Sequence, residues 1–355
     1  MTKKSARRGN NVVTIRDVAR HAGVSPMTVS RVVNAESNVR EPTRAKVLAT
    51  IKALNYSPNL AARSLASADA VRIALLYSNP SAAYLAEFLV GSLEQSGQSG
   101  CQLLIEKCDG PASERAAIEK LLAAGADGVI LPPPLCDCDV VLSVLAEAGA
   151  PVVAVATGRQ SQDLAAVRID DFEAARAMTR HLLSLGHRDL ALIKGHPNQT
   201  VSLERERGFR AAMAEAGAAV SQDRVVQGYF TYRSGLDAAE ALLKAAPRPS
   251  AIFACNDDMA AATVAVAHRV GLDVPGDLTV AGFDDTALAT TVWPNLTTVR
   301  QPIVDMARAA VQLLVEQIRR KRSGQSPEVS HRLLEFTLLP RDSTAAFAPT
   351  RDGVG

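Results

Sequence analysis

The chain has 355 residues, of which 47% are hydrophobic and 21% charged, a balance typical of a soluble globular protein with room for two or three domains. No apolar stretch is long enough to cross a bilayer, and no apolar segment follows the basic start of the sequence, so we expect neither a membrane protein nor an exported solute-binding protein. Residues 1–70 hold 12 lysines and arginines against 4 acidic residues, whereas the remainder holds 27 against 33. A basic amino-terminal part on an acidic body favours contact with a polyphosphate.

Two short helices joined by a glycine turn are predicted between residues 14 and 34. Ile15, Val18 and Ala19 recur at helical spacing and form one buried stripe on the first helix. Gly23 can take the positive φ of the turn, and Ser25 is a natural N-cap for a second helix that begins at the proline after it. This is the helix-turn-helix arrangement. Such a hairpin also occurs in ordinary protein cores, so the pattern alone leaves both interpretations open.

The second helix is the candidate reader of DNA, because an α-helix fits the major groove. It buries its three valines and turns four side chains outward: Pro26, Met27, Ser30 and Arg31. Met27 and Arg31 are the candidates for base edges, since arginine can bond the O6 and N7 of guanine together. A third helix over residues 42–55 closes this small domain, and we expect its start to fray because neither Arg40 nor Glu41 is a good N-cap.

Three segments carry a family signature: Val18-Ala19 with Ala22-Gly23-Val24-Ser25, then Thr28-Val29-Ser30-Arg31-Val32-Val33-Asn34, then Leu54-Asn55-Tyr56-Ser57-Pro58-Asn59. They resemble the lactose-repressor/galactose-repressor (LacI/GalR) family of bacterial transcription regulators, and the resemblance extends over nearly the whole chain. Polar residues of this domain are expected to bond phosphate oxygens, which sets register without reading sequence. We assign DNA contacts to Thr14, Ser25, Pro26, Met27, Thr28, Ser30, Arg31, Asn34, Thr43, Tyr56, Asn59 and Leu65.

Residues 58–66 form the next informative segment, which is too short to be a stable helix by itself. The resemblance implies a hinge helix that orders only on DNA and pairs with its twin in the minor groove. Leu65 stands where the family inserts a leucine between base pairs, which unstacks them and bends the duplex. A plain interdomain linker is the alternative.

From Val71 onward, strand-like and helical segments alternate, which argues for parallel sheets covered on both faces. We expect strands at about 72–77, 101–106, 128–131, 152–156, 166–169, 189–193, 224–227, 251–254 and 278–282, and helices at about 83–95, 113–124, 139–148, 172–185, 202–216, 234–245, 257–269 and 303–321. The fold class is therefore α/β, with two doubly wound halves in a bilobed core like that of periplasmic binding proteins, and an all-α head. Ligands lodge between such lobes, at the carboxyl ends of the strands.

The predicted domains follow from these elements and, for the crossovers between the lobes, from the resemblance. They are a disordered basic tail at 1–13, the helix-turn-helix domain at 14–57, the hinge and linker at 58–70, the bilobed effector and dimerisation domain at 71–341, and a flexible tail at 342–355. The first lobe takes about 71–165 plus 300–325, and the second about 166–296 plus 330–341.

Seven residues are the candidates for an effector site: Ser81, Tyr84, Arg205, Phe230, Asn256, Asp284 and Gln301. Their positions match the family's effector pocket, and each also has a chemical argument. Arg205 can bond two hydroxyls or a carboxylate at once, Asn256 both donates and accepts, and Asp284 can accept two hydroxyl bonds. Together these three favour a hydroxylated small molecule such as a sugar.

Three of these assignments have a plainer alternative. Arg205 could form a surface ion pair with Glu204 or Glu206, Asn256 could be a simple helix cap, and Phe230 could belong to the core. Ser81 and Tyr84 would form the first-lobe wall, and Gln301 would reach the ligand from the crossover. Ala156 stands where some sugar-responsive members of the family carry an aspartate, which leaves the identity of the ligand open.

Five cysteines have no paired framework, and Cys136 and Cys138 stand too close together for a zinc knuckle. We therefore expect reduced thiols in a cytoplasmic protein, with no metal and no cofactor. The leading hypothesis is a repressor that binds a palindromic operator as a homodimer and responds to a small effector, by release or by recruitment. The alternatives are a small-molecule-binding protein with a vestigial head, and an enzyme on the same core. The enzyme is disfavoured because the sequence has no nucleophile elbow, phosphate loop or dinucleotide fingerprint.

Overall fold

The computed structural model describes residues 13–33, 39–54, 56, 70–159, 163–218, 220–326 and 328–348. It divides into two compact units, residues 1–70 and residues 71–355. The hinge segment 58–66 and the candidate residues Asn34, Asn59 and Leu65 lie outside the described residues.

The first unit is a three-helix domain whose valines form its core. Its helices are α1 (Ile15–Ala22), α2 (Pro26–Val33) and α3 (Glu41–Ala53). Val18, Val29 and Val47, one from each helix, are fully buried against one another. This core holds α2 in place, with the helix face opposite Val29 turned to solvent.

Local capping explains where these helices begin. Thr14 and Asp17 form a capping box at the start of α1, and Gly23 ends that helix with a φ of 63°. The Thr28 N–H donates to Ser25 Oγ over 3.1 Å, which confirms Ser25 as the N-cap of α2. Arg40 precedes α3 without a side-chain capping bond, as the sequence predicted.

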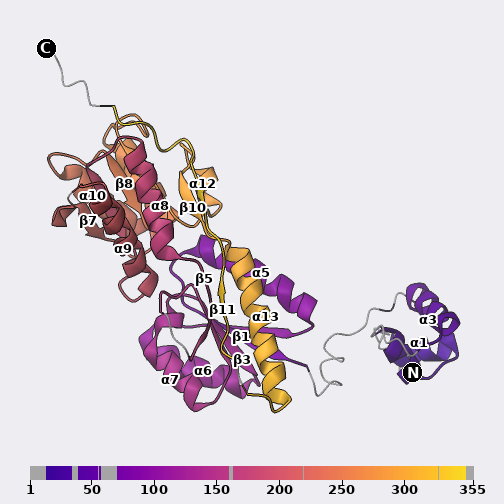
Figure 1. Cartoon of the computed structure of the whole chain (residues 1–355). Coiled ribbons are helices and arrows are strands. Elements are labelled where there is room, and N and C mark those ends of the chain that lie inside the picture. The colour runs from indigo at the N-terminus through magenta and orange to yellow at the C-terminus, as the bar shows by residue number, and fades with distance from the viewer. Residues whose placement is uncertain are drawn as a thin grey trace, which may run out of the picture. The chain divides into compact units, whose positions relative to one another are not determined.

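The first lobe of the larger unit is built on a parallel six-stranded sheet in the order β11-β5-β4-β3-β1-β2. Its strands are β1 (Arg72–Tyr77), β2 (Gln102–Lys107), β3 (Gly128–Leu131), β4 (Val152–Val155), β5 (Ala165–Arg168) and β11 (His331–Leu333). Helices α5 (Ala82–Ser99) and α13 (Ile303–Arg322) lie side by side on one face, and α6 (Glu114–Ala123) and α7 (Asp139–Glu147) cover the other (Figure 1). Alternation along β1 supplies both faces, since Ile73 and Leu75 join one buried cluster while Ala74 and Leu76 join the other.

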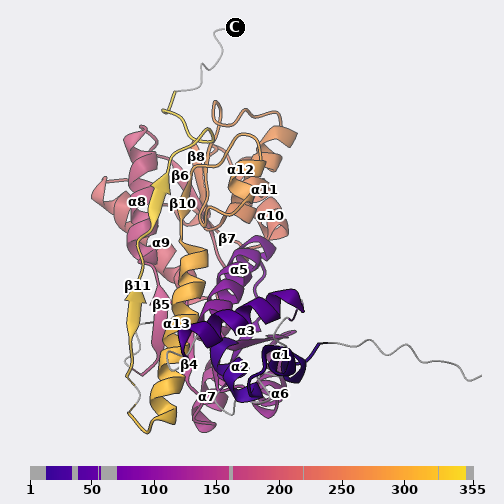
Figure 2. The same ribbon diagram turned by 90° about the vertical axis from the view of Figure 1, so that its right-hand side faces the viewer.

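The second lobe has a parallel four-stranded sheet in the order β7-β6-β8-β9. Its strands are β6 (Leu190–Lys194), β7 (Val225–Gln227), β8 (Ala251–Ala254) and β9 (Thr279–Ala281). Helices α8 (Asp171–Ser184) and α9 (Thr200–Glu215) pack together on one face, and α10 (Tyr232–Lys244) and α11 (Asp257–Arg269) on the other (Figure 2). Gly208 permits the close approach of α9 to α8, because a Cβ there would lie 2.2 Å from the Phe172 carbonyl oxygen.

Short elements complete the described part of the body. They are the 3-10 turns η1 (Pro111–Ser113), η2 (Leu135–Asp137) and η3 (Gln222–Arg224), helix α12 (Leu288–Thr291), and the antiparallel pair β10 (Thr298–Arg300) and β12 (Thr337–Leu339). The chain crosses between the lobes three times, after β5, between β10 and α13, and between β11 and β12. No helix within the described ranges is both long enough and apolar enough to cross a membrane.

The predicted boundary between the lobes was wrong at two strands. Residues 166–169 and 330–333 were assigned to the second lobe, but β5 pairs with β4, and β11 pairs with β5, in the sheet of the first. The chain therefore crosses after β5 and not before it. The sequence predicts two strands in succession at this point, at 152–156 and 166–169, and periodicity alone does not show to which sheet the second strand belongs.

The predicted flexible tail was also wrong for residues 342–348. Ser343 is fully buried and its carbonyl accepts from the Val280 N–H over 2.9 Å, beside β9. The Phe347 N–H donates to the Leu185 carbonyl over 2.8 Å, and its ring packs edge-on against His187. The tail is thus bonded along the second lobe, through backbone contacts that its composition does not reveal.

Candidate functional site

The exposed face of α2 gathers several of the predicted DNA contacts. Met27 is 63% exposed, and Pro26 and Arg31 are also exposed. A hollow of about 370 Å³ between the starts of α2 and α3 is lined by Val24, Ser25, Thr28, Arg31, Val39, Arg40 and Thr43. Four predicted contacts therefore share one small surface, which combines two guanidinium groups with three hydroxyls.

The other predicted contacts in the described part of this domain take structural roles. The Thr14 hydroxyl donates to Asp17 Oδ2 over 2.6 Å at the start of α1, and Ser30 is half-buried on α2. Tyr56 packs partly against the valine core after α3. Thr14 thus caps α1, and Tyr56 takes part in the packing of the domain.

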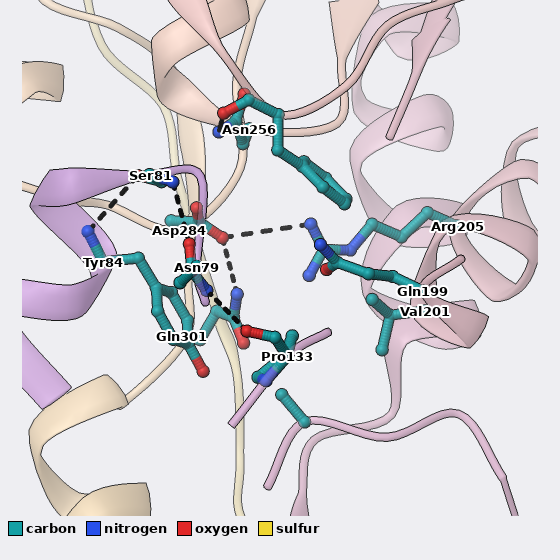
Figure 3. A pocket seen from close by; sticks show the side chains of 12 residues that line it. Asn79, Ser81, Tyr84, Pro133, Gln199, Val201, Arg205, Asn256, Asp284 and Gln301 are labelled. Carbon is teal, nitrogen blue, oxygen red and sulfur yellow. Dashed lines mark hydrogen bonds and ion pairs between the residues drawn. The ribbon is translucent and has the colours of Figure 1, made fainter. Parts of the chain in front are cut away.

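A buried cavity lies between the two lobes of the larger unit, and all seven predicted effector residues line it (Figure 3). The open space measures about 30 Å³, which is room for a few water molecules at most. The lining consists of Asn79, Ser81, Tyr84, Pro133, Ala156, Gln199, Val201, Arg205, Phe230, Asn256, Asp284 and Gln301. The seven residues come from six separate stretches of sequence, so their convergence is a result of the fold.

Sheet topology explains the convergence. Ser81 and Tyr84 follow β1 in the first lobe, Asn256 follows β8 and Asp284 follows β9 in the second. Carboxyl ends of parallel strands share one edge of a sheet, so these side chains meet where the two lobes face each other. Gln301 enters from the crossover between β10 and α13.

Arg205 on α9 is the central cation of the cavity and is 3% exposed. Its Nε donates to Asp171 Oδ1 over 2.8 Å, and its Nη1 donates to the Cys255 carbonyl over 2.6 Å. The guanidinium carbon lies 3.7 Å from the centre of the Phe283 ring and 5.7 Å from that of Phe230. Such a guanidinium is held by charge, hydrogen bonds and ring stacking together.

The alternative ion pairs proposed for Arg205 are wrong. Glu204 pairs with Arg207, and Glu206 pairs with Arg210 and Lys194. Neighbours on a helix point about 100° apart, so a residue that faces inward leaves the residues on either side of it at the surface.

Asp284 faces Arg205 from the end of β9 and is 5% exposed. Its Oδ1 lies 3.9 Å from Arg205 Nη1 and accepts from Gln301 Nε2 over 2.5 Å. Burial raises the pKa of Asp284 to about 7, against the opposing effects of Arg205 and Gln301. Its φ of 112° is strained for a side chain with a Cβ, and Ala156 and Phe230 in the same wall also have positive φ, at 51° and 59°. Strain of this kind tends to gather at binding sites.

Asn256 and Phe230 both line the cavity, and each also takes its alternative role. Asn256 Oδ1 accepts from the Met259 N–H over 3.0 Å and so caps α11, while Nδ2 donates to the Phe230 carbonyl over 3.1 Å. Phe230 lines the cavity and also belongs to the large buried cluster. Its ring lies over Gly195, where an added Cβ would stand 1.9 Å from Phe230 Cζ.

Two polar atoms in the wall lack a hydrogen-bond partner within the described part of the structure. They are the Tyr84 hydroxyl and Gln301 Oε1, both on side chains that are at least 95% buried. Burial raises the pKa of Tyr84 well above its usual value, so the hydroxyl remains a donor as well as an acceptor. Unpartnered buried groups are costly, and a ligand's polar atoms can satisfy them.

Several lining residues were not predicted. Asn79, Pro133, Ala156, Gln199 and Val201 complete the wall. Val201 stands four residues before Arg205 on α9, so helical spacing could have identified it. Asp171, the buried partner of Arg205, directly follows the turn after β5, and a carboxylate at a strand end was the available signal.

Direct hydrogen bonds join the two lobes around the cavity. Ser81 Oγ of the first lobe donates to Asp258 Oδ2 of the second over 2.7 Å. On the other side, Asp137 Oδ2 of the first lobe accepts from both the backbone N–H and the hydroxyl of Thr200, each over 2.8 Å. These bonds connect the lobes in the closed arrangement, and neither Asp137 nor Thr200 lines the cavity.

Each of the two units contains a match to a protein-family model. Residues 14–59 match the family model of bacterial regulatory proteins of the lacI family, and residues 179–344 match that of the periplasmic binding protein-like domain. The chain is 34% identical over 324 residues to catabolite control protein A of Priestia megaterium, covering 90% of this chain and 97% of that protein. It is 36% identical over 330 residues to the transcriptional repressor PurR of Klebsiella pneumoniae (strain 342), covering 91% and 96%.

Two solved structures extend the similarity to complexes. The lac repressor dimer bound to operator and the anti-inducer ONPF superposes with a TM-score of 0.76 at 28% identity, over 94% of this chain and 99% of that one. The complex of the transcriptional regulator CelR with cellobiose gives a TM-score of 0.71 at 32% identity, over 93% and 99%. Similarity therefore spans the head and the body together.

Proposed function

The chain belongs to the LacI family of bacterial regulatory proteins, and from this membership we propose that it is a repressor whose affinity for operator DNA is set by a small hydroxylated molecule between its lobes. It is a ligand-responsive, DNA-binding transcriptional regulator and not an enzyme. The observation that supports the finer proposal is the convergence of Arg205, Asn256 and Asp284 on one buried cavity. These side chains offer the donors and acceptors that vicinal hydroxyls of a sugar require.

The DNA half of the proposal rests on the exposed face of α2. Met27 and Arg31 would meet base edges in the major groove, while Ser25, Thr28 and Thr43 would bond phosphate oxygens. Thr14, Pro26, Ser30 and Tyr56 would support these contacts, and Asn34, Asn59 and Leu65 keep the roles that the family resemblance implies. A homodimer on a palindromic operator is the simplest arrangement, because two-fold proteins match two-fold sites. A regulator of chromosomal DNA would work in the cytoplasm.

Entry of the effector requires the lobes to move apart. The space of about 30 Å³ is far below the roughly 300 Å³ or more of a typical ligand site. Opening would break the bond from Ser81 to Asp258 and the bonds from Thr200 to Asp137. A ligand that binds one arrangement of the lobes more tightly than the other would raise the fraction of molecules in that arrangement. The affinity of the chain for its operator would change with that fraction.

Titration of the full chain against DNA tests the regulatory function. An operator is first selected from random duplexes, and its affinity is measured by fluorescence anisotropy at several salt concentrations. A steep salt dependence with strong sequence preference is expected. Arg31→Ala should lose about 1–3 kcal/mol of sequence discrimination, whereas the control Arg233→Ala, on an exposed part of α10, should not. Absence of any sequence preference in the wild type would reduce the chain to a binding protein.

The effector half is tested separately on the same DNA. Sugars and nucleobases that raise the thermal stability of the chain are added to the complex with operator. Asp284→Ala should abolish the change in DNA affinity and leave binding in the absence of ligand intact. A response that survives this substitution would show that the effector binds elsewhere.

A further inference from the structure

We propose that the effector carries no negative charge, and that the cavity selects an uncharged or cationic molecule rich in hydrogen-bond donors while it rejects phosphate esters and carboxylates. This rests on the proposed function, because it names the chemical class of ligand for the same cavity. The charges of the wall and the supply of donors and acceptors in it are two separate arguments for this class.

Acidic side chains outnumber cationic ones in and around the cavity. Asp171, Asp257 and Asp284 are each at least 95% buried. Arg205 is the one cationic side chain among the described residues of the wall. Burial raises the pKa of Asp171 and of Asp284, which is the behaviour of carboxylates that one guanidinium does not fully compensate. An entering anion would add to this repulsion.

Arg205 is already paired with a buried carboxylate and bonded to a backbone carbonyl. Asp171 takes its Nε, the Cys255 carbonyl takes its Nη1, and the rings of Phe283 and Phe230 approach its plane. A bidentate bond to phosphate needs two adjacent N–H groups of the guanidinium that are directed at the ligand. The bond to Asp171 takes the Nε–H and balances the charge of the guanidinium, whereas its other N–H groups can still donate to the hydroxyls of an uncharged ligand.

Neighbouring cations are paired outside the wall. Lys194 lies 3.2 Å from Glu206, and Arg300 lies 2.7 Å from Asp285. Arg159, beyond the first-lobe wall, lies 2.7 Å from Asp139. None of these three cations lines the cavity, so a phosphate inside it would find no lysine or second arginine among the described lining residues.

The orientation of Gln301 requires a donor from the ligand. Its amide nitrogen donates to Asp284 Oδ1 over 2.5 Å. Gln301 Oε1 is therefore the atom left without a partner, and it is a pure acceptor. Asn79 Nδ2 and Asn256 Nδ2 each donate to a protein carbonyl, and these bonds take up part of the donors of the wall. An O–H or N–H of the ligand satisfies Gln301, whereas a phosphate or carboxylate oxygen cannot.

Thermal shift and calorimetry on the full chain test the charge rule with matched pairs of probes: fructose and fructose 1-phosphate, ribose and ribose 5-phosphate, adenosine and adenosine 5′-monophosphate. The uncharged member of at least one pair should bind, and its phosphate ester should bind at least about 100-fold more weakly, because juxtaposed like charges in a buried site are strongly unfavourable. A shift counts as cavity binding only if Arg205→Gln, or Phe230→Leu should that variant not fold, removes it. This control excludes anions that bind the basic head.

Neutralisation of the wall provides the converse test. Asp284→Asn keeps the size of the side chain and its tolerance of positive φ. It should reduce the ratio between the dissociation constants of the phosphate ester and its uncharged partner at least about tenfold. Asp237→Asn, on the outer face of α10, is the matched control and should leave the discrimination unchanged.

Two results would overturn the proposal: a phosphate ester that binds the cavity as tightly as its uncharged partner, or a panel in which no uncharged probe binds there. Operator affinity is measured on the same samples. A chain that binds operator and releases or tightens it with an anion contradicts the charge rule alone. A chain without sequence-specific DNA binding contradicts the proposed function instead.

Discussion

Asp137 should stabilise the closed body although it does not touch the cavity. The Asp137 side chain is 1% exposed, and its carboxylate accepts from the N–H and hydroxyl of Thr200 and, over 2.6 Å, from the Thr157 hydroxyl. Gln199, the N-cap residue of α9, makes no side-chain capping bond. A carboxylate of the first lobe therefore caps the second-lobe helix that carries Arg205, where the helix dipole also favours a negative charge.

Replacement of Asp137 by alanine should lower the free energy of unfolding of the body by about 3 kcal/mol. Hydrogen bonds to a charged group contribute about 1.5–3 kcal/mol each, and a buried donor left unpaired costs about 1–3 kcal/mol. The two hydroxyls can rotate to other acceptors, so the Thr200 N–H accounts for most of the loss. Asp137→Asn should cost less, because its amide oxygen can face Thr200 while its nitrogen donates to Thr157.

Chemical denaturation followed by circular dichroism measures this effect, with Asp139→Ala as the control two residues away. The Asp139 side chain is 82% exposed and pairs only with Arg159 among the contacts of the described residues. An exposed ion pair of this kind contributes roughly 0–1 kcal/mol. Equal losses for the two alanine variants would refute the capping role of Asp137.

Three further predictions concern the cavity and the head. Gly195→Ala should weaken the ligand response at least about tenfold and leave DNA affinity unchanged, because its Cβ would stand 1.9 Å from Phe230 Cζ and displace that ring in the cavity wall. An unchanged response in the anisotropy assay would contradict the assignment of Phe230 to the effector site. Since burial raises the folded-state pKa of Asp284 from 3.8 to about 7, the folded state keeps a proton that the unfolded state releases, so the unfolding free energy should fall as pH rises from about 4 to 7. Asp284→Asn should reduce the dependence of the unfolding free energy on pH in a series of melting curves. Part of that dependence should remain because burial also raises the pKa of Asp257. A pH dependence equal to that of the wild type would argue against a raised pKa of Asp284. Val29→Ala should cost the head about 2 kcal/mol, because Val29 is fully buried, and so abolish operator binding while ligand binding by thermal shift persists; parallel loss of both would show that the two units do not fold independently.

Closure of the cavity gives a physical basis for regulation by a ligand. The bonds from Ser81 to Asp258 and from Thr200 to Asp137 join the lobes directly, so the closed arrangement has stabilising contacts of its own. An effector must replace part of these contacts with its own polar groups. The difference in its affinity for the two arrangements is the quantity that a regulator can transmit.

The sequence predicted local structure correctly where a single residue determines the backbone conformation. Ser25 followed by proline predicted the start of α2, Gly23 predicted the turn before it, and both are as expected. Polar residues directly after apolar strands, such as Asn256 and Asp284, predicted side chains at a shared sheet edge, and the fold brings them into one cavity. These features depend on a few neighbours along the chain, which the sequence lists in order.

Pairings between distant segments were decided only by the tertiary structure. In the order of elements β5 directly follows β4, and only the hydrogen bonds of β5 to β4 assign that strand to the first lobe. In the same way, Arg205 could have paired with a near neighbour on its helix, and it pairs with Asp171, 34 residues away. The caps that Asp137 provides across the lobes, and the bonds that fix the tail at Ser343, are of the same kind. Local propensity determines which elements form, whereas burial and hydrogen bonding in the packed body determine which of them meet.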